Sequence, residues 1–199
     1  MNEKKELINS HIDIMTIIAH ARKMGWESMN VNTLQRCVYL LKVLYSFIDC
    51  INENLFSHYH FNVTTYGPYS ELIHRSVVFL LTSRRLDGDM YGDIKNISDD
   101  GVDEMDVEKI KWIDTILLIL SKYGESKIFS FIVNDPLYDV AVKSNQPHEI
   151  QVTSENDTLL VLNDFKQAFE ETLSDTSFIS KEEYISLYFD YIFSRIIRG

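Results

Sequence analysis

The first residues with chemical potential are two histidines separated by one residue. His58 and His60 flank Tyr59, so both imidazoles point to the same side if this segment is extended. A metal site needs further ligands, and no spaced set of Cys, His or Glu residues is visible nearby. We therefore expect a solvated loop here and no bound metal.

Acidic residues suggest cation sites in two other stretches, but neither stretch has the pattern of a calcium loop. Asp87, Asp89 and Asp93 have a glycine at the second position of the run, whereas a calcium loop needs one at the sixth position and a closing glutamate. Between residues 99 and 108, six acids precede an apolar helical pattern, and negative charge stabilises a helix N-terminus. We expect a turn in the first stretch and a charged helix start in the second.

The candidate nucleophiles also have structural explanations. Cys37 lies within an apolar helical pattern, where a buried inert thiol is expected, and Ser70 lies where it can cap a helix. Cys37 and Cys50 form neither a disulfide framework nor a metal motif. The seven glycines are scattered, with no phosphate-binding loop and no Gly-x-Ser-x-Gly elbow. The sequence therefore favours a protein that is not an enzyme and uses no cofactor.

Composition bounds the class of protein. The 199 residues fit one medium-sized domain or a compact domain with an appended helical layer, and 45% hydrophobic content with only 3 Pro favours a mostly helical globular protein. The formal net charge of −11 repels phosphate backbones, so nucleic-acid binding needs a local basic patch. No signal peptide and no membrane-spanning apolar run are visible, so we expect a cytoplasmic protein.

The N-terminal half alternates helical and extended patterns. Apolar residues have helical spacing over residues 4–23 and again through VNTLQRCVYLLKVLYSFIDCI. The alternating segment YHFNVTTY predicts a short strand that must end at Pro68, which cannot donate a strand hydrogen bond. Ser70 then caps a third helix, and a small hairpin follows around the turn at Asp87 and Gly88. This order is that of a winged helix-turn-helix domain.

The C-terminal half predicts further helices. A fourth helix follows the acids, and two short helices pivot at Pro136. Two closing helices cover about residues 157–173 and the segment after a capping box of Ser180 and Glu183. The expected fold class is mainly α with a small β-hairpin wing, in which a helical extension packs on a winged helix-turn-helix core as one compact unit. The proposed division places the core at residues 1–104 and the extension at residues 105–199.

Two surfaces are candidates for binding. Over residues 70–97, four basic residues are balanced by four acids, whereas a DNA-reading domain usually has a basic surplus. The candidate nucleic-acid contacts are Arg75, Arg84, Arg85 and Lys95, with pairing to neighbouring aspartates as an equal alternative for Arg84 and Arg85. The last predicted helix is apolar on more than one face, which indicates either burial on several sides or contact with another protein. Its candidate partner-binding residues are Tyr184, Tyr188, Tyr191 and Phe193.

Three stretches carry a resemblance to known proteins. LQRCVYLLKVLYSF, FNVTTYGPYSELIHRSVVFLLTSRRLDGD and IKNISDDG resemble the pattern of the YwgA-type and SocA-like (Panacea) bacterial winged-helix families. Those families have a Leu-Gln-Lys-type helix, a Tyr-Gly-Pro-Tyr-Ser turn, a helix, a wing and an Ile-Thr-x-x-Gly-like exit. The similarity covers about residues 32–143, and Arg36 and Ser98 stand where lysine and threonine are usual. Its distinctive motif consists of Tyr66, Gly67, Pro68, Tyr69 and Ser70.

The resemblance implies a role in an assembly. Related winged-helix proteins serve as antitoxin or adaptor domains, and as small middle components of bacterial three-component ABC-ATPase defence systems of the Lamassu type. By this resemblance we expect a non-enzymatic accessory subunit that binds a larger partner, an SMC-like ABC ATPase or a nuclease effector, in an antiphage or genome-defence complex. The alternative is a DNA-binding transcriptional regulator or antitoxin that places its winged helix on duplex DNA.

Overall fold

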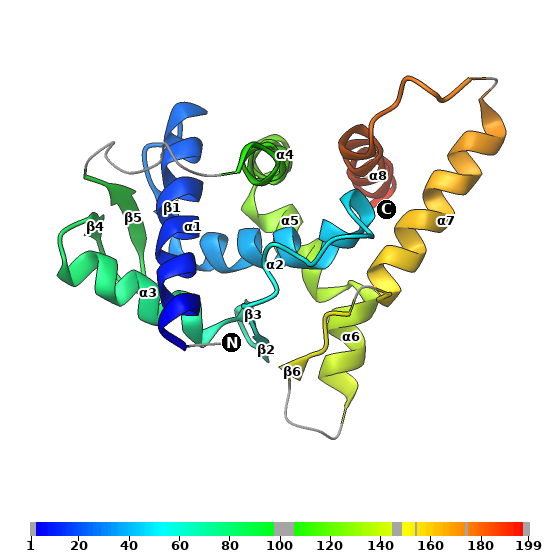
Figure 1. Ribbon diagram of the computed structural model, residues 1–199. Coiled ribbons are helices and arrows are strands. Elements are labelled where there is room, and N and C mark those ends of the chain that lie inside the picture. The colour runs from blue at the N-terminus through cyan, green and yellow to red at the C-terminus, as the bar shows by residue number, and fades with distance from the viewer. Residues whose placement is uncertain (1–2, 98–105, 145–148, 154, 174, 197–199) are drawn as a thin grey trace.

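A computed structural model describes residues 3–97, 106–144, 149–153, 155–173 and 175–196 (Figure 1). Within these ranges the chain is mainly helical with two small antiparallel sheets, as the sequence predicts. The helices are α1 (Glu3–Lys23), α2 (Val31–Ile48), α3 (Glu71–Thr82), α4 (Val107–Tyr123), α5 (Glu125–Val133), α6 (Pro136–Lys143), α7 (Asp157–Thr172) and α8 (Lys181–Ile196). The strands are β1 (Met29–Asn30), β2 (Phe61–Thr64), β3 (Gly67–Tyr69), β4 (Leu86–Gly88), β5 (Asp93–Asn96) and β6 (Glu149–Ile150).

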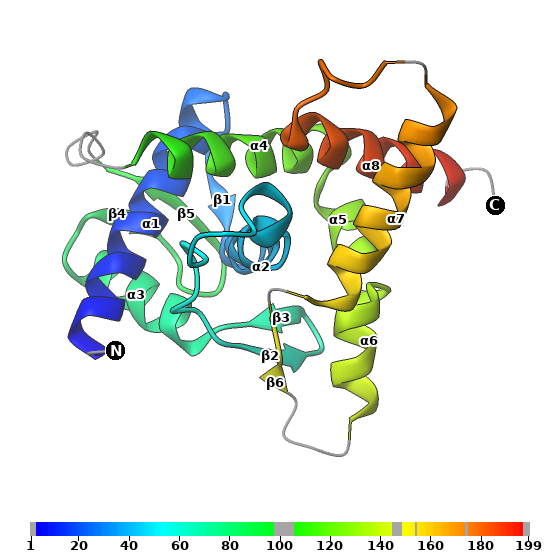
Figure 2. The same cartoon turned by 45° about the vertical axis from the view of Figure 1, so that its right-hand side comes forward.

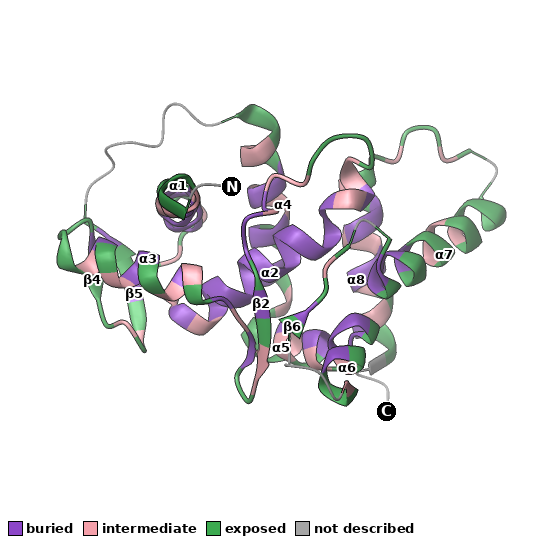
Figure 3. Ribbon diagram, turned by 60° about the horizontal axis from the view of Figure 1, so that its bottom comes forward, coloured by how far each residue is buried: buried purple, intermediate pink, exposed green. Residues whose placement is uncertain are grey.

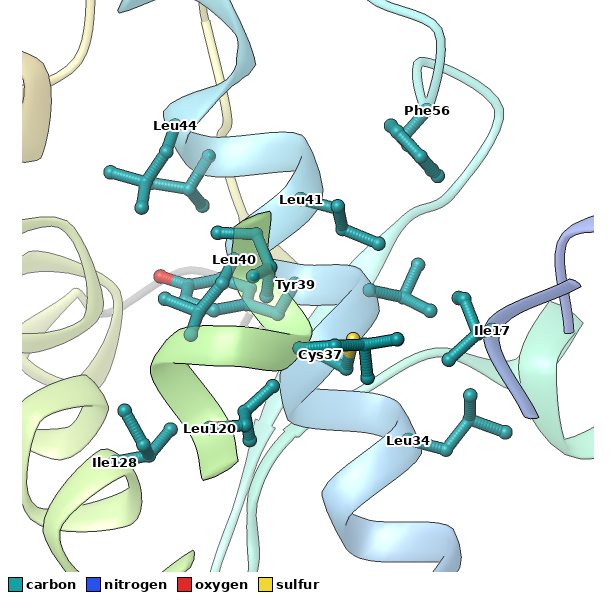
Figure 4. Packing of buried hydrophobic residues seen from close by; sticks show 14 of the residues in the cluster. Ile17, Leu34, Cys37, Tyr39, Leu40, Leu41, Leu44, Phe56, Leu120 and Ile128 are labelled. Carbon is teal, nitrogen blue, oxygen red and sulfur yellow. The ribbon is translucent and has the colours of Figure 1, made fainter. Parts of the chain in front are cut away.

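Helix α2 is the centre of the fold. Fifteen of its eighteen residues are buried, so neighbours cover it on almost every side. Figure 4 shows Ile17 and Phe56 on one side of this helix and Leu120 and Ile128 on the other. Cys37 is completely buried there, and burial raises the pKa of its thiol far above the usual value, so the thiol stays protonated. This placement confirms the predicted inert cysteine.

The two halves of the chain share one hydrophobic core. A single cluster of buried apolar side chains includes members from every helix, α1 through α8, and the buried residues fill the interior (Figure 3). In Figure 2, α4 spans the molecule from α1 to α8, above α2. Within the described residues the C-terminal helices are therefore part of the same packed unit as the N-terminal ones.

The β2–β3 hairpin corrects the expectation that the extended segment ends before Pro68. The chain reverses after Thr64, and Gly67–Tyr69 forms a second strand in which Pro68 lies opposite Val63. Strand β3 is at the edge of the sheet ordered β3-β2-β6. An edge strand can accommodate proline because one side of its backbone has no strand to receive a hydrogen bond.

The second sheet confirms the predicted hairpin near residue 88. Strand β4 pairs with β5 in antiparallel register, with Leu86 opposite Asn96, and the short strand β1 completes the order β1-β5-β4. Gly88 has φ +131°, and a Cβ atom there would lie 2.0 Å from the carbonyl oxygen of Asp93. The hairpin therefore depends on glycine at this position, the last residue of β4. The predicted position of the turn, Asp87 and Gly88, is wrong, because both residues pair within the sheet and the chain reverses over residues 89–92.

The C-terminal helix boundaries follow the predicted caps. Pro136 occupies the first turn of α6, and the carboxylate of Asp135 accepts a hydrogen bond from the Leu137 N–H at 3.2 Å. At α8 the capping box is formed in both directions: the Glu183 carboxylate accepts from the Ser180 N–H at 2.7 Å, and the Ser180 hydroxyl accepts from the Glu183 N–H at 3.2 Å. Among the helices described, none combines the length and the apolar character that crossing a bilayer requires.

Candidate docking pocket beside the Tyr-Gly-Pro-Tyr-Ser hairpin

Buried hydrogen bonds from α2 fix the end of the Tyr-Gly-Pro-Tyr-Ser motif. The side-chain amide of Gln35 accepts from the backbone N–H of Ser70 at 2.8 Å and donates to its carbonyl oxygen at 3.2 Å. The predicted capping bond from the Ser70 side chain is wrong, because Ser70 Oγ is buried without a hydrogen-bond partner. The position of the cap is right, but the backbone of Ser70 makes the contacts that hold the segment.

On one side of the hairpin, Arg36 makes contacts that we call the arginine clamp: Arg36, Glu125 and Phe129. The guanidinium donates to the Tyr66 carbonyl oxygen at 2.8 Å, pairs with Glu125 at 2.5 Å and lies 4.4 Å from the centre of the Phe129 ring. Gly67 has φ +106°, and the position of a Cβ atom there would face the Phe129 ring at 3.5 Å. The backbone conformation therefore requires glycine at position 67, and the arginine clamp packs directly against this glycine.

On the other side of the hairpin lies an open pocket of about 560 Å³, which we call the aromatic pocket. Four segments of the chain line it: the first turns of α2, the β2–β3 hairpin, the start of α3 and the turn between β4 and β5. Its aromatic lining residues are Tyr66, Tyr69, His74 and Tyr91. Its volume is within the range of pockets that bind small ligands or the side chains of a partner.

Three of the aromatic rings of this pocket are neighbours in a row. The His74 ring lies 6.1 Å from the Tyr69 ring and 6.1 Å from the Tyr91 ring, measured between centroids. Tyr66 is 70% exposed and Tyr91 is 77% exposed, so the pocket is bordered by two large aromatic side chains that the rest of the described chain leaves open to contact. The Tyr69 hydroxyl donates to the Glu71 carboxylate at 3.0 Å; partial burial, and secondly this bond, raise the Tyr69 pKa to about 12.

The candidate partner-binding residues of the last helix lie mainly inside the protein. Tyr184, Tyr188 and Phe193 are buried, and they pack against aromatic residues of α5 and α7, with the Tyr184 ring nearly perpendicular to that of Phe169. Only Tyr191 presents its ring to solvent, at 43% exposure. Core packing, the first of the two alternatives for this helix, therefore accounts for three of the four.

The candidate nucleic-acid contacts differ in their pairing. Arg75 forms an ion pair with Glu3 at 2.8 Å, and Lys95 pairs with Asp87 at 3.3 Å. Arg84 and Arg85 are exposed at the end of α3, and neither pairs with a carboxylate of the described residues. Arg84 has φ 56°, the left-handed conformation that usually belongs to glycine after a helix C-terminus.

The two histidines do not converge, and the solvated-loop expectation is wrong for the first of them. His58 is buried with its Nε2 atom 3.3 Å from Asp13, without hydrogen-bond geometry, whereas His60 is exposed beside Glu149. Asp13 is buried too, and it pairs with Lys109 at 2.5 Å and accepts from the Tyr59 hydroxyl at 3.2 Å. The sequence analysis missed this cluster; the signal that could have revealed it is the aspartate at position 13 among the apolar residues of the first predicted helix.

The acids that suggested cation sites have ordinary partners where they are described. The Asp89 carboxylate accepts from the Tyr91 N–H at 2.8 Å, and Asp93 accepts from the Asn30 side chain at 3.1 Å, as in a closed turn. Residues 98–105, which include Ser98 and four of the acids before α4, lie outside the described residues. Across the part of the chain that is described, no three His, Cys, Asp or Glu side chains are grouped so that they could hold a metal ion.

No protein-family model, curated protein or solved structure matches this chain. Its function therefore has to be inferred from the geometry of the aromatic pocket and the surfaces around it.

Proposed function

We propose that this chain is a non-enzymatic accessory subunit that docks onto a larger protein through the aromatic pocket. The observation that carries this proposal is the exposure of Tyr66 and Tyr91 around one pocket, with His74 and Tyr69 between them. Aromatic residues are enriched at protein interfaces because a rigid ring buries a large area at a small cost in side-chain entropy. A buried hydrogen bond to Gln35 and a partly buried one from Arg36 hold the hairpin in place, so the binding surface is formed before a partner arrives.

A winged-helix-like scaffold is part of this proposal. Its support is the order of elements: three helices, α1, α2 and α3, combined with a sheet ordered β1-β5-β4 in which β4 and β5 form a hairpin. In this interpretation the β4–β5 hairpin is the wing, and the β2–β3 hairpin is an insertion between the second and third helices. The aromatic pocket then lies between the insertion and the wing, since both supply lining residues.

The first partners to test are those that the family resemblance suggests. They are an SMC-like ABC ATPase and a nuclease effector of a bacterial antiphage or genome-defence complex. The net charge of −11 is compatible with a subunit that contacts DNA only through its partner, since the field of such a protein repels phosphate.

The test is co-purification of the full chain with the products of its neighbouring genes. Tyr91→Ala and Tyr66→Ala should each weaken the complex, whereas Tyr191→Ala, on the far helix α8, serves as a matched control with an exposed tyrosine. Binding constants measured by calorimetry on purified components should then show whether the partner contacts the aromatic pocket or helix α8. A complex that tolerates both pocket substitutions and is lost with Tyr191→Ala would overturn the proposal, as would a chain that binds none of these products.

A second function, direct DNA binding, is favoured by one observation. Arg84 and Arg85 are exposed side by side with no described carboxylate partner, at the end of the helix that would be the recognition helix of a winged module. If this surface contacts phosphate, affinity for duplex DNA should fall steeply with salt, and the Arg84→Ala, Arg85→Ala double variant should reduce the slope of log K against log salt by about 2. Affinity that is equal for the double variant and the parent protein would eliminate this function.

A further inference from the structure

The geometry points to one chemical class of occupant for the aromatic pocket: we propose that it binds the guanidinium of an arginine side chain presented by a partner protein. This inference rests on the proposed docking function and specifies what the docked segment must carry. It combines three properties of the pocket, which are the ring faces, the sign of the surrounding charge and the precedent of the arginine clamp.

The ring faces suit a flat cation. Tyr69, His74 and Tyr91 are consecutive neighbours at 6.1 Å between ring centres, and Tyr66 adds a fourth ring at the hairpin tip. The face of an aromatic ring carries negative potential, so it attracts a cation placed over it, and arginine is found in this position more often than lysine. A guanidinium is planar and weakly hydrated, so it also stacks on a ring with little loss of solvation.

The charges around the pocket have the sign that a cation needs. None of its described lining residues is lysine or arginine. The Glu71 carboxylate is held beside the pocket by the Tyr69 hydroxyl, and Asp89 and Asp93 are in the turn that carries Tyr91. The guanidinium of Arg36, which donates to the carbonyl oxygen of the lining residue Tyr66, is paired with Glu125. Carboxylate or phosphate ligands are therefore disfavoured.

The same hairpin already holds one arginine in the proposed way. In the arginine clamp the guanidinium lies over the Phe129 ring, pairs with a glutamate and donates to a backbone carbonyl. The aromatic pocket is lined by rings, and the carboxylate of Glu71 is next to it, hydrogen-bonded to the lining residue Tyr69, but no arginine of the described chain lines the pocket. A partner arginine would complete a second arrangement of the same chemistry.

The experiment uses the full chain and small probes. N-acetyl-arginine N-methylamide is titrated into labelled protein and followed by NMR chemical shifts of the tyrosine and histidine rings, with N-acetyl-citrulline N-methylamide as the uncharged isostere. We expect saturable shifts for the arginine probe with a dissociation constant on the order of millimolar, the affinity that a ligand of this size can reach. The citrulline probe should bind at least about tenfold more weakly, since it lacks the cation.

Variants assign the binding to the pocket. Tyr91→Ala and Glu71→Gln should each weaken the arginine probe by roughly threefold to tenfold, whereas Phe178→Ala, which removes an exposed ring outside the pocket, should leave its affinity unchanged. The arginine assignment would be overturned if the citrulline probe bound with the same affinity as the arginine probe, or if the chemical shifts never saturated. It would also be overturned if acetate or inorganic phosphate, used as probes, bound in preference to the arginine probe.

The two proposals can fail separately. If partner binding is lost in Tyr91→Ala but the arginine probe does not bind, the docking function stands and the guanidinium assignment is wrong. If the probe binds the pocket but pocket substitutions leave the partner complex intact, the guanidinium site stands and the docking function is wrong. Thermal unfolding of each variant checks that the change is confined to the exposed side chain.

Discussion

The two sides of the β2–β3 hairpin have similar residue types but different roles: one side stabilises the fold, and the other is open to a partner. On the arginine clamp side, a guanidinium, a carboxylate and an aromatic ring are all supplied by this chain and satisfy one another. On the aromatic pocket side, the rings and a carboxylate are present, while Tyr66 and Tyr91 remain exposed to solvent. A protein can use the same contact to hold its own fold or to recognise another chain. Substitutions in the clamp should therefore change stability, whereas those in the pocket should change binding.

The largest expected effect is in the clamp. Arg36→Ala removes the donor to the partly buried Tyr66 carbonyl and the stack on Phe129, so we expect the free energy of unfolding to fall by about 3 kcal/mol. Arg36→Lys, the matched control, keeps the charge near Glu125 but cannot make the forked contacts, so its loss should be about half as large. Urea denaturation measures both; a loss below about 0.5 kcal/mol for Arg36→Ala would contradict the assigned role of the clamp.

A second effect on the free energy of unfolding, of similar size, depends on pH and involves α6, a helix that supports the hairpin. The Tyr138 hydroxyl of α6 donates to the Thr64 carbonyl at 2.9 Å, and Asp135 caps this helix. Burial raises the pKa of Asp135 to about 6, although hydrogen bonds from Thr158 and the Leu137 N–H oppose the shift. Because the folded pKa is above the unfolded value of 3.8, the folded protein binds more protons than the unfolded chain between these values. Stability contributed by this group is therefore present at low pH and declines as the pH rises through that window.

The measurement is the difference in unfolding free energy between the parent protein and Asp135→Asn, followed from pH 4 to pH 7. We expect this difference to fall by about 2–3 kcal/mol as the pH rises, because asparagine can still cap α6 but has no charge to bury. A flat difference for Asp135→Asn across this range would show that burial does not raise the pKa of its carboxyl.

A smaller loss of stability is expected at Gly67, the glycine between the arginine clamp and the aromatic pocket. Gly67→Ala places a side chain at φ +106°, and the new Cβ atom makes contacts of 3.5 and 3.6 Å to Phe129 and Arg36, which are ordinary distances. The expected loss of stability, about 1–2 kcal/mol, therefore comes from backbone strain and not from a clash. Gly25→Ala, at φ +92° with no atom within 4 Å of the new Cβ atom, is the control for strain without contacts, so its loss should be similar. A loss for Gly67→Ala far above that of Gly25→Ala by thermal unfolding would show that contacts, and not strain, set the cost at Gly67.

Local patterns were sufficient to predict most helices but not the contacts that build the two sides. The apolar stripe of α2, the caps of α6 and α8 and the β4–β5 hairpin depend on neighbours within a few residues, and all four are present in the structure, although the turn of the hairpin is at residues 89–92 and not at Gly88. Gln35 and Ser70 are 35 residues apart, and Arg36 and Glu125 are 89 residues apart. No periodicity links such positions, because their proximity is set by how the helices pack.

The same limit explains why local patterns could not decide three features of the candidate sites. The tyrosine-rich stripe of α8 indicated either a core or a partner surface, and only the packing of α5 and α7 against it buries Tyr184 and Tyr188. His58 was assigned to a loop, since nothing in its own segment reveals the buried carboxylate of Asp13 on α1. The aromatic pocket was missed for the same reason: its tyrosines come from β3, the hairpin tip and the β4–β5 turn.

The smallest expected effect on stability, and the largest on binding, is that of the exposed pocket tyrosines. Tyr66→Ala and Tyr91→Ala remove rings that are mostly in solvent, so each should change the free energy of unfolding by less than about 0.5 kcal/mol. Tyr91→Phe keeps the ring face and should bind the partner and the arginine probe almost as well as the parent protein, because the face and not the hydroxyl attracts the cation. If Tyr91→Ala instead unfolded the protein as strongly as Arg36→Ala, both sides of the hairpin would be structural, and the distinction between a filled and an open arginine site would be lost.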